Sequence, residues 1–315
     1  MRANKCSNSK NPEMVDLEYP RRRRSARNLG ILMGLLVPAS WAEPVAISPR
    51  WLVSFPASTN SKAYESAAVP VEGDSMLVTV NGGGADPMTP KLQLGNRPIP
   101  AKVIGHDPVS RLLFLQFQDS VSIKSNEWLS DAAASSSASM VAMTPNGPLK
   151  CRTTGWVKQV GGKILPFALL RVTFGATVPP PGTPLMDDSG RIAAIVFQDA
   201  GAGNTGYAIP AEAVSRVQRD ICSGGHLVRG WLGLSLRAEA QSPQVIRVLP
   251  NSPASASGVL PGDVIVSIGS RQVTDYADAA NAFFYLIPGQ PVEVKLLRGV
   301  DQLVYTLTPT KPVSK

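Results

Sequence analysis

Residues 179–198, PPPGTPLMDDSGRIAAIVFQ, hold several side chains that could do chemistry. Thr183 and Ser189 offer hydroxyl groups, which act as nucleophiles when a neighbouring base takes their proton. Asp187 and Asp188 form a carboxylate pair that could act in general acid–base catalysis. The order Asp-Asp-Ser-Gly, however, favours a purely structural role in a turn. The stretch itself contains no base for the hydroxyl groups. Acyl-transfer chemistry here would therefore need a histidine from elsewhere in the chain.

The chain has two histidines, and neither is well placed for that role. His106 directly precedes Asp107, and neighbouring side chains on a strand point to opposite faces of a sheet, so the two cannot act as a base and its orienting acid. His226 follows Gly224 and Gly225 in a segment that is typical of a solvated linker. No spacing of cysteine and histidine resembles a metal site, so the sequence predicts neither a metal nor another cofactor.

The elements that would position these residues are short strands. Apolar runs of strand length, bounded by glycine and proline, dominate the sequence and indicate a mostly β protein. Strands are expected at residues 51–55, 67–71, 74–80, 91–94, 100–104, 112–117, 140–143, 154–160, 168–172 and 191–197. Their regular spacing favours an antiparallel barrel or sandwich, and the Ala- and Ser-rich residues 130–139 are the expected loop between two halves.

Within residues 206–221, GYAIPAEAVSRVQRDI, the spacing of apolar residues changes from that of a strand to that of a helix. Ala213, Val214, Val217 and Ile221 fall on one helical face, and the glycines at 224 and 225 end the pattern. We interpret this segment as a linker helix between two domains, because a second β-rich unit begins near residue 228.

The N-terminus has the features of an export signal. Basic residues at 21–24 and 27 precede an apolar run at 29–37, and small residues lead to Ala42. The sequence predicts a signal peptide at residues 1–42, and an uncleaved anchor is the alternative, although the run is shorter than the about 20 residues of a membrane span. Localisation in the periplasm or cell envelope follows from this prediction.

Most of the basic charge belongs to this segment. The whole chain has a formal net charge of +8, and residues 1–42 hold eight Lys and Arg against three Asp and Glu. No basic stripe interleaved with aromatic residues remains, so nucleic acid is not an expected partner. Cys151 and Cys222 remain after the signal, and the alternatives for them are a disulfide in an oxidising compartment or two separate thiols.

The proline-rich stretch resembles the nucleophile segment of the HtrA/Deg family of trypsin-like serine proteases, in which G-N-S-G-G-P-L is followed by a turn and an apolar strand. When residues 182–185 are matched to G-G-P-L, the nucleophile position is Pro181. The family's I-L-T-N-N-H-V pattern places the base at Asn81, and its D-P-x-T-D-L-A-V-L pattern places the orienting aspartate at Arg111. Pro181 lacks a hydroxyl, and Pro179 and Pro181 lack the N–H groups of the family's oxyanion hole. The resemblance therefore implies a degenerate protease framework.

The C-terminal part resembles the PDZ domain that HtrA proteases carry, on motifs that include GWLG at 230–233, SPA at 252–254, PGDVI at 261–265 and Arg298. A PDZ domain binds a peptide C-terminus as an added strand, and N–H groups of a glycine-containing loop receive the carboxylate. The bulky leucines favour an apolar C-terminal residue on the ligand. The peptide-binding residues that the resemblance implies are Gly230, Trp231, Leu232, Gly233, Leu234, Ser235, Leu236, Ala279, Ala280 and Phe283.

These features predict a signal peptide (1–42), a trypsin-like protease-like domain (47–205), a linker helix (206–227) and a PDZ domain (228–311). The expected fold class is mostly β, a degenerate trypsin-like double β-barrel followed by an α+β PDZ domain. The favoured function is an inactive, exported HtrA-like protein that binds peptide C-termini or unfolded proteins in a regulatory, adaptor or quality-control role. Partners that the resemblance allows are further copies of the chain and active HtrA relatives.

Two alternatives remain open at this stage. The chain could be an active HtrA-type serine endopeptidase with an unrecognised active site, which would require the matches at Asn81, Arg111 and Pro181 to be wrong. It could also be a PDZ scaffold for one fixed partner, or its PDZ unit could only pack against the barrel.

Overall fold

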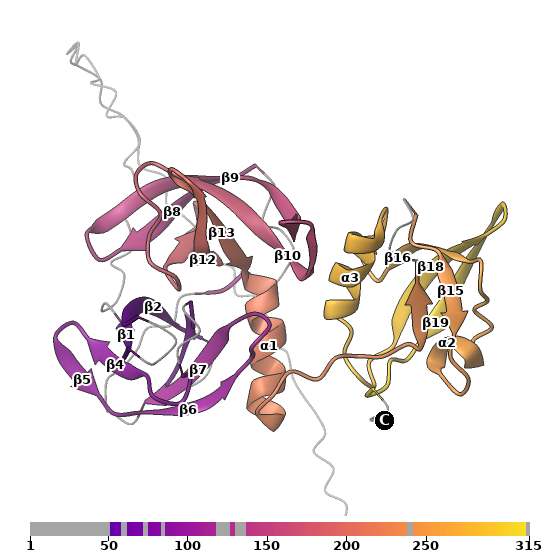
Figure 1. The fold of residues 1–315 in the computed structure, drawn as a ribbon, viewed down its shortest axis with the longest axis horizontal. Coiled ribbons are helices and arrows are strands. Elements are labelled where there is room, and N and C mark those ends of the chain that lie inside the picture. Colours follow the sequence, from indigo (N-terminus) through magenta and orange to yellow (C-terminus); the bar gives the residue numbers. More distant parts are fainter. Residues whose placement is uncertain are drawn as a thin grey trace, which may run out of the picture. The chain divides into compact units, whose positions relative to one another are not determined.

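Figure 1 shows a computed structural model of the chain, which describes residues 51–57, 62–71, 75–82, 86–117, 127–129, 137–237 and 242–312. These residues belong to one compact unit, Pro44–Lys315. The predicted signal peptide lies outside the described residues, as does most of the predicted loop at 130–139. The described part is mostly β, as the apolar pattern predicts.

The N-terminal part is a seven-stranded antiparallel sheet with the order β5-β4-β1-β2-β3-β7-β6. In β1, Trp51, Val53 and Phe55 are buried and alternate with less buried residues, so one face of the strand packs on the core. β1, β4 and β7 begin and end where the sequence predicts. The bounds are β1 Trp51–Phe55, β2 Tyr64–Pro70, β3 Met76–Val80, β4 Lys91–Leu94, β5 Arg97–Ile99, β6 Ala101–His106 and β7 Leu112–Phe117.

The next six strands form a closed barrel with the order β10-β13-β12-β11-β8-β9, and closure leaves no unpaired edge. β9 and β10 form a hairpin that is much longer than the sequence predicts, and Gly161 and Gly162 make its turn with positive φ. The bounds are β8 Ser139–Thr144, β9 Gly147–Val160, β10 Lys163–Phe174, β11 Pro184–Met186, β12 Ile192–Ala202 and β13 Thr205–Pro210.

Helix α1 (Ala211–Gly224) follows the barrel directly. The four residues predicted to share a face, Ala213, Val214, Val217 and Ile221, are all buried, and Gly225 ends the helix in the left-handed conformation with φ 75°. The predicted helix at 206–227 is too long, because residues 206–210 belong to β13. These residues pair with β10 and β12 and close the barrel, a tertiary constraint that the local pattern does not reveal.

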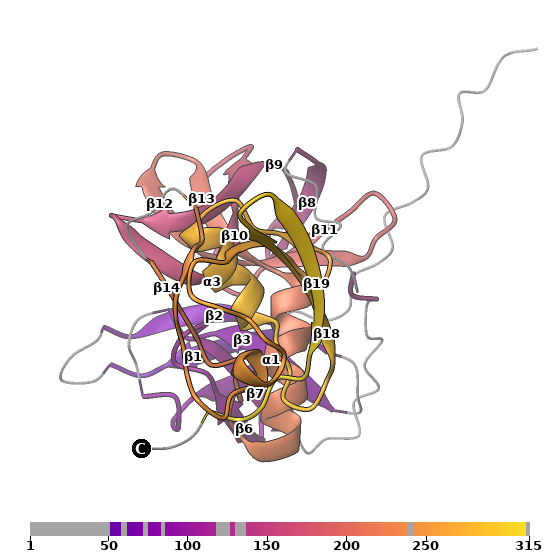
Figure 2. The same cartoon turned by 90° about the vertical axis from the view of Figure 1, so that its right-hand side faces the viewer.

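The C-terminal part combines a two-stranded sheet, a four-stranded sheet in the order β17-β16-β18-β19 and two helices. Figure 2 shows β18 and β19 as a long antiparallel hairpin. Asp275 caps α3, because its carboxylate accepts a hydrogen bond from the N–H of Asp278. The bounds are β14 Leu234–Leu236, β15 Val245–Val248, α2 Pro253–Ala256, β16 Val264–Ile268, β17 Arg271–Gln272, α3 Tyr276–Phe284, β18 Val292–Arg298 and β19 Asp301–Leu307.

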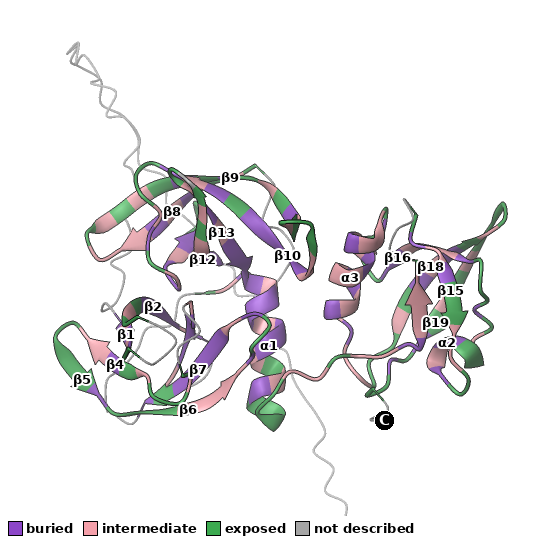
Figure 3. Ribbon diagram, in the orientation of Figure 1, coloured by how far each residue is buried: buried purple, intermediate pink, exposed green. Residues whose placement is uncertain are grey.

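One hydrophobic cluster joins all of these parts. It contains residues of the N-terminal sheet, of the barrel, of α1 and of α3, including Val78, Leu112, Ile209, Val217 and Phe284. Figure 3 shows the buried residues along α1 and the strands beside it.

Helix α3 packs against the β9–β10 hairpin through three contacts. The rings of Phe284 and Phe167 lie 4.7 Å apart. Asn281 Oδ1 accepts a hydrogen bond of 2.8 Å from the N–H of Ala168, and Asp278 forms an ion pair with Lys158. The C-terminal domain is therefore held to the barrel by specific polar contacts as well as by apolar packing.

The described cysteines are free. Cys151 is buried in the barrel core, where desolvation raises the pKa of its thiol to about 11, whereas Cys222 is exposed on α1. Of the two alternatives from the sequence, the structure has two separate thiols. None of the helices in the described part of the chain has the length and hydrophobicity that a membrane span requires.

The N-terminal sheet meets the barrel at Gly182. The N–H of Ala67 donates to the carbonyl of Pro181 over 2.8 Å. Gly182 has φ +80°, and a Cβ added there would lie 1.9 Å from the carbonyl oxygen of Ala67. Only glycine fits at this crossing point, because any side chain would push the two β units apart.

We expect Gly182→Ala to lower the free energy of unfolding by about 3 kcal/mol, because backbone atoms of Ala67 must move. Gly190→Ala is the matched control: Gly190 also has positive φ, but no atom lies within 4 Å of its added Cβ, and a loss of about 1 kcal/mol is expected. Urea unfolding followed by tryptophan fluorescence measures both. Equal losses in the two variants would contradict the steric explanation.

Asp263 and Arg298 form an ion pair in the C-terminal domain, in which the side chain of Asp263 is 1 % exposed and that of Arg298 is 38 % exposed. Both carboxylate oxygens of Asp263 accept hydrogen bonds from the Arg298 guanidinium, over 2.8 and 2.9 Å, and Oδ2 also accepts the N–H of Leu260. The hydrogen bonds from Arg298 lower the pKa of Asp263, against the opposing effect of burial. Two of the motif residues found in the sequence therefore owe their identity to one ion pair.

This pair predicts how stability depends on pH. The pKa of Asp263 in the folded protein is below its value of about 3.9 in an unfolded chain, so the stabilisation is complete above that value and is lost as the pH falls through the folded pKa. We expect Asp263→Asn to be less stable at neutral pH and to lose less stability on acidification. Thermal unfolding between about pH 2.5 and 7 measures this. Asp188→Asn, at an exposed turn residue, should keep the original pH dependence.

Candidate functional site

The structure brings together the three positions at which the resemblance places the catalytic residues. The N–H of Asn81 donates to the carbonyl of Arg111 over 2.8 Å. Arg111 Nη1 lies 3.4 Å from the carbonyl oxygen of Gly82, and a Cβ on Gly82 would lie 3.4 Å from Cγ of Pro181. The strand β3, the β6–β7 turn and the segment before β11 therefore converge on one place.

Two of these residues have unusual environments. Asn81 is 4 % exposed, and its Oδ1 accepts a hydrogen bond of 2.5 Å from the hydroxyl of Tyr64. Arg111 adopts the left-handed conformation with φ 58°, and its guanidinium lies 4.7 Å from the ring centroid of Phe197 and 3.2 Å from Oε1 of Gln198. The positive charge of Arg111 therefore lies against the face of an aromatic ring and beside neutral oxygen atoms.

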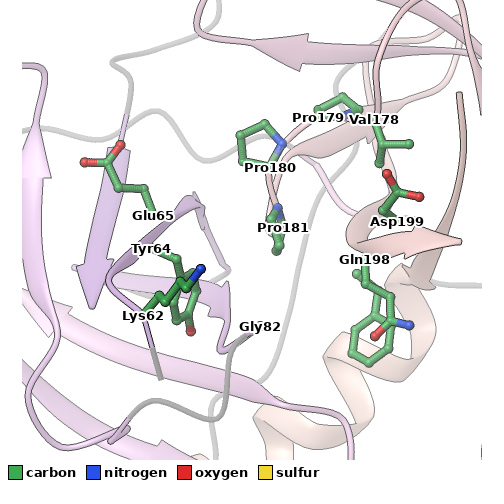
Figure 4. Close-up of a pocket in the computed structure, with 11 residues that line it drawn as sticks. Lys62, Tyr64, Glu65, Gly82, Val178, Pro179, Pro180, Pro181, Gln198 and Asp199 are labelled. Carbon is green, nitrogen blue, oxygen red and sulfur yellow. The ribbon is translucent and has the colours of Figure 1, made fainter. Parts of the chain in front are cut away.

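A pocket of about 540 Å³ opens at this place (Figure 4). One wall is formed by prolines and another by Tyr64 and Gly82. The lining residues are Lys62, Tyr64, Glu65, Gly82, Val178, Pro179, Pro180, Pro181, Phe197, Gln198 and Asp199. Because proline has no N–H, the wall from 179 to 181 presents no backbone donors to a ligand.

The polar groups next to the proline wall are already engaged. The N–H of Gly182 donates to the carbonyl of Val196 over 2.7 Å, and both the N–H and the hydroxyl of Thr183 donate to the carbonyl of Pro180. Thr183 is completely buried. No donor or nucleophile of this segment is therefore directed at the pocket.

The Asp-Asp-Ser-Gly segment forms a turn, as the structural interpretation of its sequence predicts. Asp187 accepts hydrogen bonds from the N–H groups of Ser189 and Arg191, and it forms an ion pair with the Arg191 side chain. Its carboxylate therefore serves the turn before β12 rather than acid and base chemistry.

Both histidines line a different pocket, of about 1020 Å³, together with Asp107 and Asp220. Burial lowers the pKa of His106, although the nearby Asp107 opposes this shift. The Asp107 carboxylate accepts hydrogen bonds of 2.8 and 2.6 Å from the N–H and the hydroxyl of Ser110. The pair is thus not a base with its orienting acid, and neither histidine lines the pocket at Pro181.

A second candidate site is a pocket of about 440 Å³ in the C-terminal domain, between β14 and α3. Within the described residues β14 pairs with β15 alone, so its other edge is open toward this pocket. The lining residues are Pro166, Arg229, Gly230, Leu234, Ser235, Leu236, Tyr276, Ala280, Phe283 and Phe284. An open strand edge beside an apolar wall can accept an extended peptide as an additional strand.

Most of the predicted peptide-binding residues lie at this groove, but some do not line it. Gly230, the three residues of β14, Ala280 and Phe283 line the pocket. Leu232 and Ala279 instead turn their side chains into the domain core, where they are 3 % and 0 % exposed. The sequence does not resolve this point, because it does not show which of two adjacent helical residues, or which residues of a loop, will face the core.

Sequence reasoning missed four groove residues. Tyr276 and Phe284 share a helical face with Ala280, and this spacing of four residues could have identified them. Arg229 immediately precedes the predicted loop. Pro166 comes from β10 of the barrel, and no local signal connects it with the groove.

The predicted carboxylate-binding loop at 230–233, which we call the anion-receptor loop, lies directly before β14. Gly233 has φ +79°, and a Cβ there would lie 2.1 Å from Cβ of Ser252, so the position requires glycine. The N–H groups of Gly230 and Trp231 donate to the carbonyls of Leu286 and Thr310. The N–H groups of Leu232 and Gly233 have no hydrogen-bond acceptor within the described residues, which leaves them available to a ligand. In the described part of the chain, no three His, Cys, Asp or Glu side chains gather as metal ligands would.

Comparisons with known proteins agree with this geometry. A PDZ domain model matches residues 230–308. The periplasmic serine endoprotease DegP of Escherichia coli K12 is 25% identical over 260 residues, which are 75% of this chain and 55% of DegP. A probable periplasmic serine endoprotease, DegP-like, of Chlamydia trachomatis serovar D is 26% identical over 241 residues, 67% of this chain and 46% of the relative. The chain thus spans about half the length of these curated relatives.

Solved structures show the same fold. The HtrA-type protease AlgW with a tripeptide has a TM-score of 0.59 and 21% identity, and the match covers 85% of this chain and 95% of AlgW. AlgW with a decapeptide has a TM-score of 0.56 and 20% identity, with 85% and 96% covered. The predicted fold class, a trypsin-like double β-barrel followed by a PDZ domain, is confirmed. The matched PDZ domain, the similarity to DegP and the fold shared with HtrA-type proteases support membership of this chain in the HtrA family.

Proposed function

We propose that this chain is an exported, catalytically inactive HtrA-type protein that binds peptide C-termini or unfolded segments in the groove between β14 and α3. Its role is regulatory, adaptor-like or in quality control, in the periplasm or cell envelope. The observation that carries the proposal is the contrast between the two sites. The positions matched to the catalytic residues hold Asn81, Arg111 and Pro181, whereas the groove has an open strand edge and a pair of loop N–H groups without an acceptor in the described part of the chain.

The pocket at Pro181 supports inactivity on several independent grounds. Acyl transfer needs a nucleophile, a base and oxyanion donors. The matched positions hold Pro181, Asn81 and Arg111, and the nearest hydroxyl, on Thr183, is buried and bonded to Pro180. Loss of one oxyanion donor alone costs about 3 to 4 kcal/mol of transition-state stabilisation, and prolines at 179 and 181 remove both donors.

The groove supports peptide binding because its chemistry is intact. Leu234, Leu236 and Phe283 provide an apolar wall of partly buried side chains. The loop N–H groups of Leu232 and Gly233 are suited to a carboxylate, and the edge of β14 supplies backbone hydrogen bonds. The similar AlgW structures contain a decapeptide and a tripeptide, which supports a peptide as the ligand of this chain.

The export signal and the relatives support the location. The basic and apolar pattern of residues 1–42 is that of a signal peptide, and the curated relatives are named periplasmic. Further copies of this chain or active HtrA relatives are the partners that we propose beside the peptide itself.

Inactivity predicts no reaction with a serine hydrolase probe. We expect the chain from Glu43 onward to remain unlabelled by a fluorophosphonate and to leave unfolded casein intact, because no activated hydroxyl faces the pocket. Gel fluorescence and a fluorogenic casein assay measure these results, with trypsin as the positive control. Labelling that disappears in Thr183→Ala or Ser189→Ala would overturn the proposal and reveal an active endopeptidase.

Peptide binding predicts affinity for a class of C-termini. We expect fluorescein-labelled peptides with apolar C-terminal residues to bind, and Leu234→Glu to weaken this binding by about tenfold or more, because a carboxylate in the groove loses its hydration and repels the peptide carboxylate. Fluorescence anisotropy measures the dissociation constants.

The matched control is Leu297→Glu, at a partly exposed leucine of β18 that does not line the groove. It should bind peptides as the unchanged chain does. Binding of one sequence alone would favour a scaffold for a fixed partner, and no binding of any apolar tail would contradict the proposal.

A further inference from the structure

Arg216 of α1 is a buried cation that the two candidate sites leave unexplained. It is 3 % exposed, and Nη1 lies 2.7 Å from Oδ2 of Asp220, one helical turn further along. Its Nη2 donates to the carbonyl oxygen of Val228 over 2.8 Å and to that of Leu286 over 3.0 Å. A buried arginine is costly to desolvate, so its placement against backbone carbonyls calls for a structural explanation.

Both acceptors are connected to the start of the anion-receptor loop. Leu286 follows α3, and its carbonyl also accepts the N–H of Gly230, the first residue of the loop, over 3.1 Å. Val228 lies two residues before Gly230, and its N–H donates to Oδ2 of Asp220 over 2.7 Å. The Arg216 and Asp220 pair therefore holds both polar backbone groups of Val228 and shares the Leu286 carbonyl with Gly230.

The contact between Gly230 and Leu286 is too close for a side chain. A Cβ on Gly230 would lie 2.7 Å from Cβ of Leu286 and 2.9 Å from its carbonyl oxygen. The loop therefore begins from a point fixed by the Leu286 carbonyl, and Arg216 determines where that carbonyl lies. A shift of this point moves the N–H groups of Leu232 and Gly233, whose direction decides how well they meet a carboxylate.

We propose that Arg216 is a positioning residue of the peptide groove, which orients the loop at 230–233 for a peptide C-terminal carboxylate. This inference rests on the proposed peptide binding. It places a determinant of carboxylate recognition on the helix that precedes the PDZ domain, outside the residues that line the groove.

The test compares two peptides that differ only at the C-terminus, one a free acid and the other an amide, both ending in the same apolar residue. The unchanged chain from Glu43 onward should bind the acid about tenfold more tightly than the amide. In Arg216→Met the affinity for the acid should fall until this preference is about twofold, while the affinity for the amide stays nearly constant. Anisotropy titrations measure all four constants.

Two further variants control for folding and charge. Arg216→Lys keeps the positive charge but has one nitrogen in place of Nη1 and Nη2, so it cannot pair with Asp220 and donate to both carbonyls in the geometry of the guanidinium. It should therefore also lose acid preference, and it carries the test if Arg216→Met does not fold. Arg219→Met removes an exposed arginine of the same helix and should keep the tenfold preference. Near-ultraviolet circular dichroism verifies that each variant is folded at the assay temperature.

The outcomes separate this inference from the proposed function. A chain that binds neither peptide, or binds both equally, contradicts carboxylate recognition itself. Unchanged acid preference in folded Arg216→Met or Arg216→Lys overturns the role of Arg216 and leaves the proposed function standing. An equal loss for acid and amide also overturns it, because that pattern indicates a general structural role.

Discussion

A single hydrophobic cluster holds the N-terminal sheet, the barrel, α1 and α3 together, and both candidate sites depend on it. Val217 and Ile221 of α1 pack against strands of both β units, and Phe284 brings the C-terminal domain to the same cluster. Apolar burial of this kind has no direction by itself. The orientation comes from the polar contacts at its edges, such as Asn281 with Ala168 and Arg216 with the Leu286 carbonyl.

Packing and charge constrain several residues at the pocket beside Pro181. Gly182 is still required at the crossing of the two β units, because its Cβ would overlap the carbonyl of Ala67. The prolines before it have no N–H group to donate into the pocket. Arg111, in the position matched to an aspartate, is accommodated by the ring of Phe197 and by Gln198. Packing therefore explains the glycine at 182, and an aromatic ring together with an amide oxygen accommodates the charge at 111.

The groove depends on parts of the chain outside the PDZ domain. Pro166 of the barrel lines it, and the hairpin that carries Pro166 is attached to α3 through Lys158 and Ala168. The start of the anion-receptor loop is likewise bonded to Leu286 and, through it, to Arg216. The groove is thus formed and held by residues of both the barrel and the C-terminal domain.

The sequence by itself determined the fold class, most strand positions, the buried face of α1 and the three matched positions, because these follow from local period and from motifs of adjacent residues. It could not identify β13 as a strand or the groove role of Pro166, since barrel closure and domain packing involve residues far apart in the chain. It also could not separate Ala279, in the core, from Ala280, in the groove. Tertiary structure decided these points, because the direction of a side chain has meaning only relative to the surface that buries it.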